Sequence, residues 1–329
     1  MAKYKILLVG CGQLGNRHLQ AVASLKDIAE IHVVDPNPAS IELGKLRLKE
    51  ISGSNQNIKF YWHDEFHESS ARGDLCIVST QAKGRCALVK QIAGELGFRT
   101  FLIEKIVSQS VDEYRDLMSF SEENGLSVWV NCKTRAYAVH KYIKSKLDPN
   151  EPFIYSRISG NDGLANNGVH TADLFVFYDD AARINSSGSR IDLVLHPSKR
   201  GQENFDLSGT LHGYTEKGSD FTMSFASNHM SPDHISIVSP RGRFIIDHMQ
   251  KFVFESSPES DWQWKRIPVE ENWRVSHMTK SFATDILRKG TCDLPTLAQC
   301  YPAHEYILSE LLPYFNKLLG KNHEFCPVT

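Results

Sequence analysis

The sequence lacks the patterns that mark several common classes of protein. It has no hydrophobic run long enough to span a bilayer, and its 37 basic and 39 acidic side chains form no long run of one charge. Neither a membrane nor a nucleic acid is therefore predicted as a partner. The N-terminus shows no signal-peptide pattern, because its short apolar run is followed at once by glycines. No internal repeat is present, and we expect a globular, cytoplasmic protein.

The cysteines also lack the spacing of a disulfide framework or a zinc site. There are seven of them, an odd number, and none forms a C-x-x-C pair. We expect free thiols in a reducing compartment. Because no H-E-x-x-H motif or paired carboxylate–histidine cluster occurs, the sequence predicts no metal.

A glycine-rich segment follows the first predicted strand, the apolar run over residues 4–9. It has the G-x-G-x-x-G spacing, formed by Gly10, Cys11, Gly12, Gln13, Leu14 and Gly15. A helix over 13–25 and a strand over 30–34 follow, and that strand closes with Asp35, at the position of an acid that bonds a ribose hydroxyl. This pattern predicts a dinucleotide site, and the alternative is a tight turn without a ligand. Asp35 favours NAD over NADP, because a carboxylate repels a 2′-phosphate.

Strands and helices alternate up to Asn131, which predicts a doubly wound parallel sheet of the Rossmann type with strand order 3-2-1-4-5-6. After the fourth strand come Ser79, Thr80 and Gln81, which we expect beside the cofactor. Lys105 follows the fifth strand at its carboxyl end, where its ammonium could stabilise an alkoxide or shuttle a proton. The alternative is a solvated lysine at the end of a strand.

Beyond residue 131 the pattern changes to an α+β domain with a large, mostly antiparallel open sheet. Strand-like stretches, RIDLVLH among them, fill residues 183–266, and helices are expected over 169–178, 275–289 and 296–319. We divide the chain into an NAD(P)-binding domain, 1–131, and a substrate-binding and oligomerisation domain, 132–329, whose closing helices could pack back on the first domain. The exposed sheet face suggests a homo-oligomer, a dimer or tetramer.

The second domain also offers polar residues for a substrate. His170, placed at the start of a helix after the turn-rich segment 160–168, is the best candidate for a general base, because an imidazole titrates near neutral pH. We expect it to converge with Lys105 on one reactive oxygen over the nicotinamide. His170 could instead be a structural histidine, Arg135 an interdomain salt-bridge partner, and Asp173 a residue that faces solvent or completes the first helical turn.

Together these residues resemble the Gfo/Idh/MocA family of sugar and cyclitol dehydrogenases along nearly the whole chain. The matching features are the glycine segment, Asp35, Glu104-Lys105 at the family's E-K-P position, Asn131 with Arg135, and residues 168–173 at its G-x-H-x-x-D position. The resemblance implies that Lys105 and His170 handle protons during hydride transfer, and it places Glu104 and Lys105 beside the cofactor.

Four positions depart from the family pattern. Ile106 replaces the proline after the lysine, so we expect no cis-proline turn there. Arg85 replaces a histidine after the fourth strand, and Gln81 replaces a proline. Asn166 stands four residues before His170, where many members carry aspartate; an amide can orient the imidazole but cannot stabilise its charge.

The predicted function is an NAD(P)-dependent oxidoreductase acting on a secondary alcohol or ketone of a sugar or sugar-nucleotide. Some features look like members linked to bacterial surface-sugar and nonulosonic-acid biosynthesis. The predicted substrate contacts are Lys105, Asn131, Lys133, Arg135, Asn161, Asn166, Asn167, His170 and Asp173. Two alternatives stay open: a non-catalytic sensor of cofactor or sugar, and a redox-neutral, NAD-assisted sugar-modifying enzyme.

Overall fold

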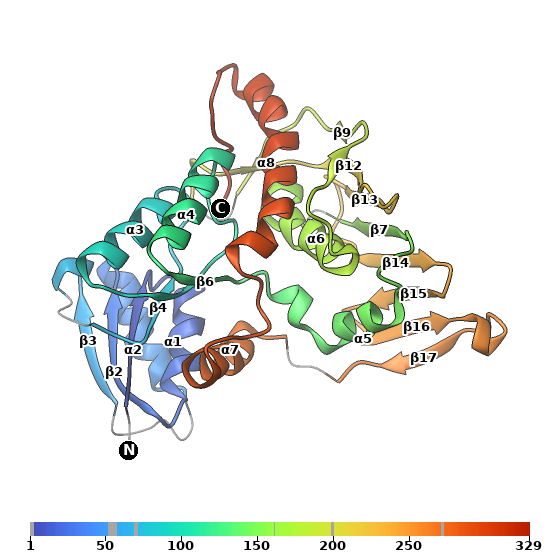
Figure 1. Cartoon of the computed structure of the whole chain (residues 1–329). Helices are drawn as coiled ribbons and strands as arrows, with labels where there is room; N and C mark the ends of the chain where they lie inside the picture. Colours follow the sequence, from blue (N-terminus) through green and yellow to red (C-terminus); the bar gives the residue numbers. More distant parts are fainter. Residues whose placement is uncertain (1–2, 52–57, 69–71, 161, 199–200, 271–272) are drawn as a thin grey trace. The chain divides into compact units, whose positions relative to one another are not determined.

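The computed structural model describes residues 3–329 except for 52–57, 69–71, 161, 199–200 and 271–272 (Figure 1). The chain divides into two compact units. Unit 1 comprises Met1–Ser108, Asp112–Asn131 and Asn272–Leu297, and unit 2 comprises Gln109–Val111, Cys132–Glu271 and Ala298–Thr329. Each unit is built around its own sheet.

The described part of unit 1 holds a six-stranded parallel sheet with the order β3-β2-β1-β4-β5-β6, which confirms the predicted doubly wound topology. The strands are β1 (Tyr4–Val9), β2 (Ile28–Val34), β3 (Lys59–His63), β4 (Leu75–Val78), β5 (Thr100–Ile103) and β6 (Ser127–Val130). The central strands are nearly continuous apolar runs and are buried, as expected for strands covered on both faces. Their carboxyl ends therefore meet at one edge of the sheet.

Five helices belong to the described part of unit 1. They are α1 (Gly15–Ala23), α2 (Pro38–Leu48), α3 (Arg85–Glu95), α4 (Val111–Glu123) and α7 (Val275–Lys289). Helix α2 begins at Pro38, because the Asn37 side chain accepts a hydrogen bond from the Ala39 amide at 3.0 Å and Pro38 occupies the first helical position. Helix α7, although distant in sequence, packs against α1.

Unit 2 is built on a mixed, mostly antiparallel sheet with the order β17-β16-β15-β14-β7-β13-β12-β8, which confirms the predicted architecture. Its strands are β7 (Ile154–Ser159), β8 (Asn185–Ser186), β9 (Arg190–Ile191), β12 (Gly209–Tyr214), β13 (Asp220–Phe225), β14 (His234–Ser239), β15 (Gly242–Asp247), β16 (Phe252–Ser256) and β17 (Lys265–Pro268). The pairing of β7 with β13 is parallel, and its pairing with β14 is antiparallel.

Alternation along these strands buries one face of the sheet. Tyr155 and Phe221 point inward, and Phe221 stacks on Phe175 of helix α6 (Leu164–Asp179) with ring centroids 5.0 Å apart. On the opposite face Ile154 and Ile158 are 56% and 55% exposed. The other helices of this unit are α5 (Ala138–Lys146) and most of α8 (Leu297–Leu319). None of the described helices is both long and apolar enough to cross a bilayer.

The expectation of a continuous strand over RIDLVLH is wrong. Only Arg190–Ile191 pairs with β12, and the chain rejoins a ladder at β10 (His196–Pro197), which pairs with β11 (Phe205–Asp206). The cause is Asp192, whose amide donates to the Ser208 carbonyl at 2.9 Å and whose carboxylate accepts from the Ser208 hydroxyl at 2.8 Å. These bonds turn the chain out of the sheet, and the apolar residues that follow Asp192 are exposed.

Candidate functional site

Two glycines of the loop after β1 are required by the protein itself. Gly10 has a φ of +88°, and a Cβ there would lie 2.9 Å from the backbone of Ser79 and Thr80. A Cβ on Gly15 would lie 2.0 Å from the Gly10 carbonyl oxygen, so this position lets α1 start directly against the loop. Both positions therefore have a packing reason for glycine.

Gly12 differs from its neighbours. A Cβ at Gly12 would meet no heavy atom of the described chain within 4 Å, and its φ lies outside the left-handed region. Helix α1 begins beside it with Leu14 as N-cap; within the described chain this start has no side-chain cap and its first turn has no acidic residue. Helix N-terminal amides and the helix dipole attract anions. The loop therefore offers open space and positive potential suited to a diphosphate.

Asp35, which directly follows β2, hydrogen-bonds the backbone of this loop. Its carboxylate accepts hydrogen bonds from the Cys11 amide at 2.6 Å and the Asn37 amide at 2.8 Å. A carboxylate can accept about four hydrogen bonds, so capacity remains for two ribose hydroxyls. Arg47 of α2, which the sequence reasoning missed, donates to the carbonyl and side-chain oxygens of Gln13 at 3.1 and 2.5 Å. This places a cation at the loop, although no arginine follows Asp35 directly in the sequence.

The residues after β4 support the same loop. The Ser79 hydroxyl donates to the Gly10 carbonyl at 2.7 Å, and the Ser79 amide donates to the Val9 carbonyl at 2.8 Å. Gln81 is exposed, and Thr80 is partly buried. Ser79 therefore holds the glycine turn in place.

The buried Arg85 bonds three backbone carbonyls around the carboxyl ends of β4 and β5. The Arg85 side chain is 1% exposed, and its guanidinium donates to the carbonyls of Thr80, Glu104 and Ile106. We expected no cis turn after Lys105 because Ile106 replaces the proline. This expectation is wrong, because the Lys105–Ile106 peptide bond is cis. Arg85 thus donates to the carbonyls of the residues on either side of Lys105.

Glu104 lies at the centre of a buried polar network. Its carboxylate accepts a hydrogen bond from the Asn131 side-chain amide at 2.5 Å and lies 2.8 Å from the His18 Nε2. The other ring nitrogen of His18, Nδ1, lies 2.9 Å from the Thr279 hydroxyl. Burial alone would raise the pKa of Glu104, but the bonds from His18 and Asn131 hold its pKa below the usual glutamate value. The sequence reasoning missed His18; the available signal was a histidine on the buried face of α1, three residues after Gly15.

Lys105 stands where predicted, directly after β5 and Glu104. Its side chain is only 4% exposed, which contradicts the alternative of a solvated strand-end lysine. A buried lysine is costly unless its ammonium is compensated. This position is consistent with a chemical role.

In unit 2, the helix that carries His170 begins earlier than predicted. Helix α6 starts at Leu164, so His170 lies in its second turn and not at its start. The cause is Asp206, forty-one residues after Ala165, whose carboxylate accepts from the Ala165 amide at 2.7 Å. A tertiary contact thus caps a segment whose asparagines and glycines favour a turn. His170 is half-buried.

The asparagines near His170 make bonds within unit 2. The Asn166 amide donates to Asp206 at 2.7 Å and to the Phe205 carbonyl at 3.0 Å, and its oxygen accepts from the Thr329 amide at 2.8 Å. The Asn167 side chain donates to the Asp162 carbonyl. Asn161, a third predicted contact, lies outside the described residues.

Arg135 and Asp173 form a buried, two-point ion pair. The Arg135 Nε donates to the Asp173 carboxylate at 2.8 Å, and its Nη2 bonds the other oxygen. Both alternatives for these residues are wrong: Arg135 bridges within unit 2 and not between domains, and Asp173 is 0% exposed. Burial raises the pKa of Asp173, and the guanidinium opposes that rise. Nearby, Lys133 donates to the Tyr137 hydroxyl at 2.6 Å.

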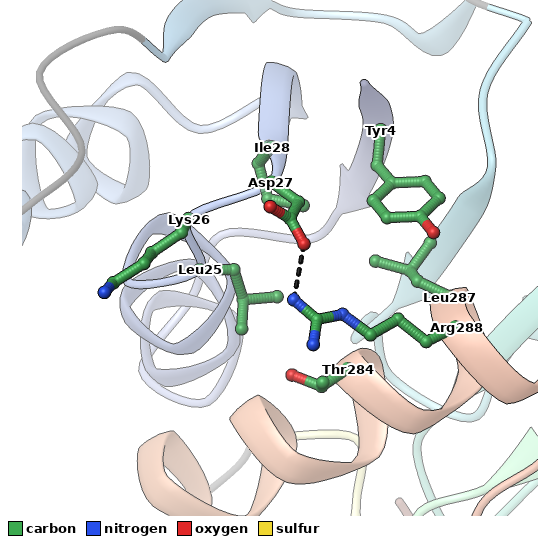
Figure 2. A pocket seen from close by; sticks show the side chains of 8 residues that line it. All are labelled: Tyr4, Leu25, Lys26, Asp27, Ile28, Thr284, Leu287 and Arg288. Carbon is green, nitrogen blue, oxygen red and sulfur yellow. Dashed lines mark hydrogen bonds and ion pairs between the residues drawn. The ribbon is translucent and has the colours of Figure 1, made fainter. Parts of the chain in front are cut away.

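Two surface hollows lie away from the predicted residues. Figure 2 shows the first, of about 30 Å³, where Arg288 of α7 bonds Asp27 at 2.5 Å beside Tyr4 and Ile28, the first residues of β1 and β2. It therefore lies at the amino edge of the sheet, opposite the glycine loop. The second, of about 590 Å³, is in unit 2 and is lined by charges of both signs, including Lys146, Arg241 and Glu255.

Known proteins match the chain through their structures. No protein-family model and no curated protein matches it. A solved oxidoreductase from Agrobacterium radiobacter, in complex with NAD+, L-tartaric acid and magnesium, is 16% identical, with a TM-score of 0.72 over 92% of this chain and 94% of that one.

Two further structures are similar to the same degree. UDP-N-acetylglucosamine 3-dehydrogenase GnnA from Acidithiobacillus ferrooxidans is 13% identical, with a TM-score of 0.69 over 95% of this chain and 97% of its own. GenD2 from gentamicin A biosynthesis, in complex with NAD, is 14% identical, with a TM-score of 0.71 over 93% of both chains. The chain thus shares its fold with these oxidoreductase and dehydrogenase structures.

Proposed function

We propose that the protein is an NAD-dependent oxidoreductase that transfers hydride between the nicotinamide and a secondary alcohol or ketone of a sugar or sugar-nucleotide. The observation that carries this proposal is Gly12, a glycine that packing within the chain does not require, beside the uncapped start of α1 and the acceptor Asp35. A bound dinucleotide explains all three features. NAD rather than NADP follows from the carboxylate of Asp35.

The substrate class is supported by the similar structures. One of them is named as a dehydrogenase of a nucleotide sugar, and two were solved with NAD. We assign cofactor binding to residues 1–131 and substrate binding to residues 132–329. A cytoplasmic role in polysaccharide biosynthesis is part of the same proposal.

The bound nicotinamide would supply the hydride chemistry, and the chain must manage the proton of the reacting hydroxyl. In this proposal the Lys105 ammonium stabilises negative charge on that oxygen, and the His170 imidazole takes or returns its proton. The Arg135–Asp173 pair fixes the segment after Asn131, from which Lys133 contacts the substrate.

Turnover of a sugar panel with NAD, followed through the absorbance of the reduced cofactor, tests the proposal. We expect Lys105→Ala and His170→Ala each to lower kcat about 10²–10⁴-fold, the usual range for a group in acid–base catalysis, while NAD still binds. The matched controls, Lys49→Ala and His229→Ala, remove exposed side chains and should turn over like the parent. Equal losses in the controls would contradict the assigned roles.

Cofactor preference gives a second test. Asp35→Ala should weaken NAD binding by about tenfold, or about 1.4 kcal/mol, because NAD loses a hydrogen bond to its ribose. NADP binding should weaken less, because the substitution also removes the repulsion between the Asp35 carboxylate and the 2′-phosphate. Titration calorimetry with both cofactors measures this difference. Equal losses for NAD and NADP would show that Asp35 does not bind the ribose.

A sensor of cofactor and sugar is a second candidate. Asn166 favours it, because an amide cannot stabilise an imidazolium at His170 by charge, and its bonds include Phe205, Asp206 and Thr329. A sensor would bind NAD without turnover, and its sugar affinity would survive Lys105→Ala. A redox-neutral enzyme would instead convert the sugar without net reduced cofactor.

We also propose that the chain forms a homo-oligomer through the outer face of the unit 2 sheet. Ile154 of β7 pairs with Val238 of β14, and both are exposed together with Ile158. Such a patch is a candidate surface for self-association. Light scattering of the parent should give a dimer or tetramer, and Ile158→Lys should lower the mass; a monomeric parent would contradict this.

A further inference from the structure

Two cysteines and a histidine meet inside unit 2, and one of the cysteines is far from the other two residues in the sequence. Cys132 directly precedes the short helix η2 (Lys133–Ala136), and Cys300 and His304 lie one turn apart on α8. The two Sγ atoms are 3.3 Å apart, and the Cys300 Sγ is 3.4 Å from the His304 Nδ1, which also lies 3.0 Å from the Cys300 carbonyl oxygen. All three side chains are 0% exposed.

The three side chains supply a set of donor atoms of the kind that binds a metal ion. One donor atom from each residue lies within 4.8 Å of the other two. Tetrahedral zinc, with Zn–S of about 2.3 Å and Zn–N of about 2.0 Å, holds its ligand atoms roughly 3.5–3.8 Å apart. The two separations from the Cys300 Sγ lie just below this range, and binding also requires the His304 Nδ1 to exchange the Cys300 carbonyl for the ion. The i, i+4 spacing of Cys300 and His304 presents both donors on one face of α8.

The donor set also selects the kind of ion. Thiolates and imidazole prefer zinc and other soft or borderline metals over magnesium or calcium. A divalent ion with two thiolates is electrically neutral as a unit, which suits a buried position.

We propose that Cys132, Cys300 and His304 bind one zinc ion, with a water molecule as the fourth ligand. On binding, the two thiols release two protons, and two Zn–S bonds and one Zn–N bond form without any change of oxidation state. The ion ties the segment that begins at Cys132 to α8. The Arg135–Asp173 pair lies beside it, because Arg135 also donates to the Gln299 carbonyl at 3.5 Å.

Metal content of the full chain tests the site. The chain is expressed in zinc-supplemented medium, purified under reducing conditions, and measured by elemental analysis. We expect one zinc per chain in the parent and in Cys326→Ser, a control that removes another buried cysteine of unit 2. Cys132→Ser and His304→Ala should each lose most of the zinc.

Cobalt in place of zinc during growth gives a spectroscopic signature. The parent and Cys326→Ser should show thiolate-to-cobalt charge-transfer bands and the strong visible bands of a tetrahedral site, and Cys300→Ser should lose the charge-transfer intensity of one thiolate. A metal-free parent, charge-transfer bands of parental intensity in Cys132→Ser, or a Cys132–Cys300 disulfide in the reduced preparation would each overturn the proposal. If the variants fail to fold, the parent's own metal content and spectrum decide. None of these readouts depends on NAD or on turnover.

Discussion

The two units hold a buried carboxylate in different ways. In unit 1, Glu104 is held by the amide of Asn131 and the imidazole of His18. In unit 2, Asp173 is held by the guanidinium of Arg135 through two parallel bonds. Removing the Asn131 amide leaves the Glu104 carboxylate with its His18 partner, whereas removing the guanidinium takes away the charged partner of the buried Asp173. The two networks should therefore respond very differently to comparable substitutions.

The units also differ in what they leave open. Unit 1 has a helix start and a glycine that face open space at the carboxyl edge of its sheet. In unit 2, the corresponding helix start at α6 is closed by Asp206. The same element, a helix N-terminus, is thus available for a ligand in one unit and used for folding in the other.

The largest effect is expected from breaking the charged network. Arg135→Met should lower the free energy of unfolding by about 3–5 kcal/mol, because the buried Asp173 then loses its charged partner and keeps the weaker hydrogen bond from the Cys300 thiol. The double variant Arg135→Met/Asp173→Leu should recover most of this loss, because it buries no charge. Chemical denaturation monitored by circular dichroism measures both.

An exposed pair provides the control for this prediction. Arg241 bonds Asp148 and Glu151 at the surface, and Arg241→Met should change stability much less. If Arg135→Met costs no more than Arg241→Met, or if the double variant is as unstable as the single one, the buried pair does not have the assigned role.

A smaller, pH-dependent effect is expected in unit 1. The pKa of Glu104 is lowered in the folded chain, so its contribution to stability is present above the unfolded glutamate pKa of about 4.3 and is lost as the pH falls through the folded value. Glu104→Gln should therefore cost about 2 kcal/mol at neutral pH. The difference from the parent should shrink as the pH falls below about 4.3. A difference that stays constant with pH would contradict a buried, ionised Glu104.

The sequence predicted unit 1 more fully than unit 2 for a physical reason. The glycine loop, Asp35 and the strand ends follow from local order along an alternating β/α chain. The start of α6 depends on Asp206, and the thiol–imidazole cluster joins Cys132 to α8 across 168 residues; no spacing in the sequence reveals either contact. Arg85 was noted only as a departure from the family pattern, because its three carbonyl partners come together only in the folded sheet.

The most direct test of the dinucleotide site is a substitution that should leave the stability of the folded chain unchanged. Gly12→Ala adds a Cβ that meets no described atom of the chain within 4 Å, and Gly94→Ala does the same in the last turn of α3, away from the loop. Without a ligand, neither variant should be less stable than the parent. Calorimetric titration with NAD should show at least about tenfold weaker binding, or about 1.4 kcal/mol, for Gly12→Ala and parental binding for Gly94→Ala. Equal affinity in the parent and Gly12→Ala, or no NAD binding by the parent, would contradict the assigned diphosphate site.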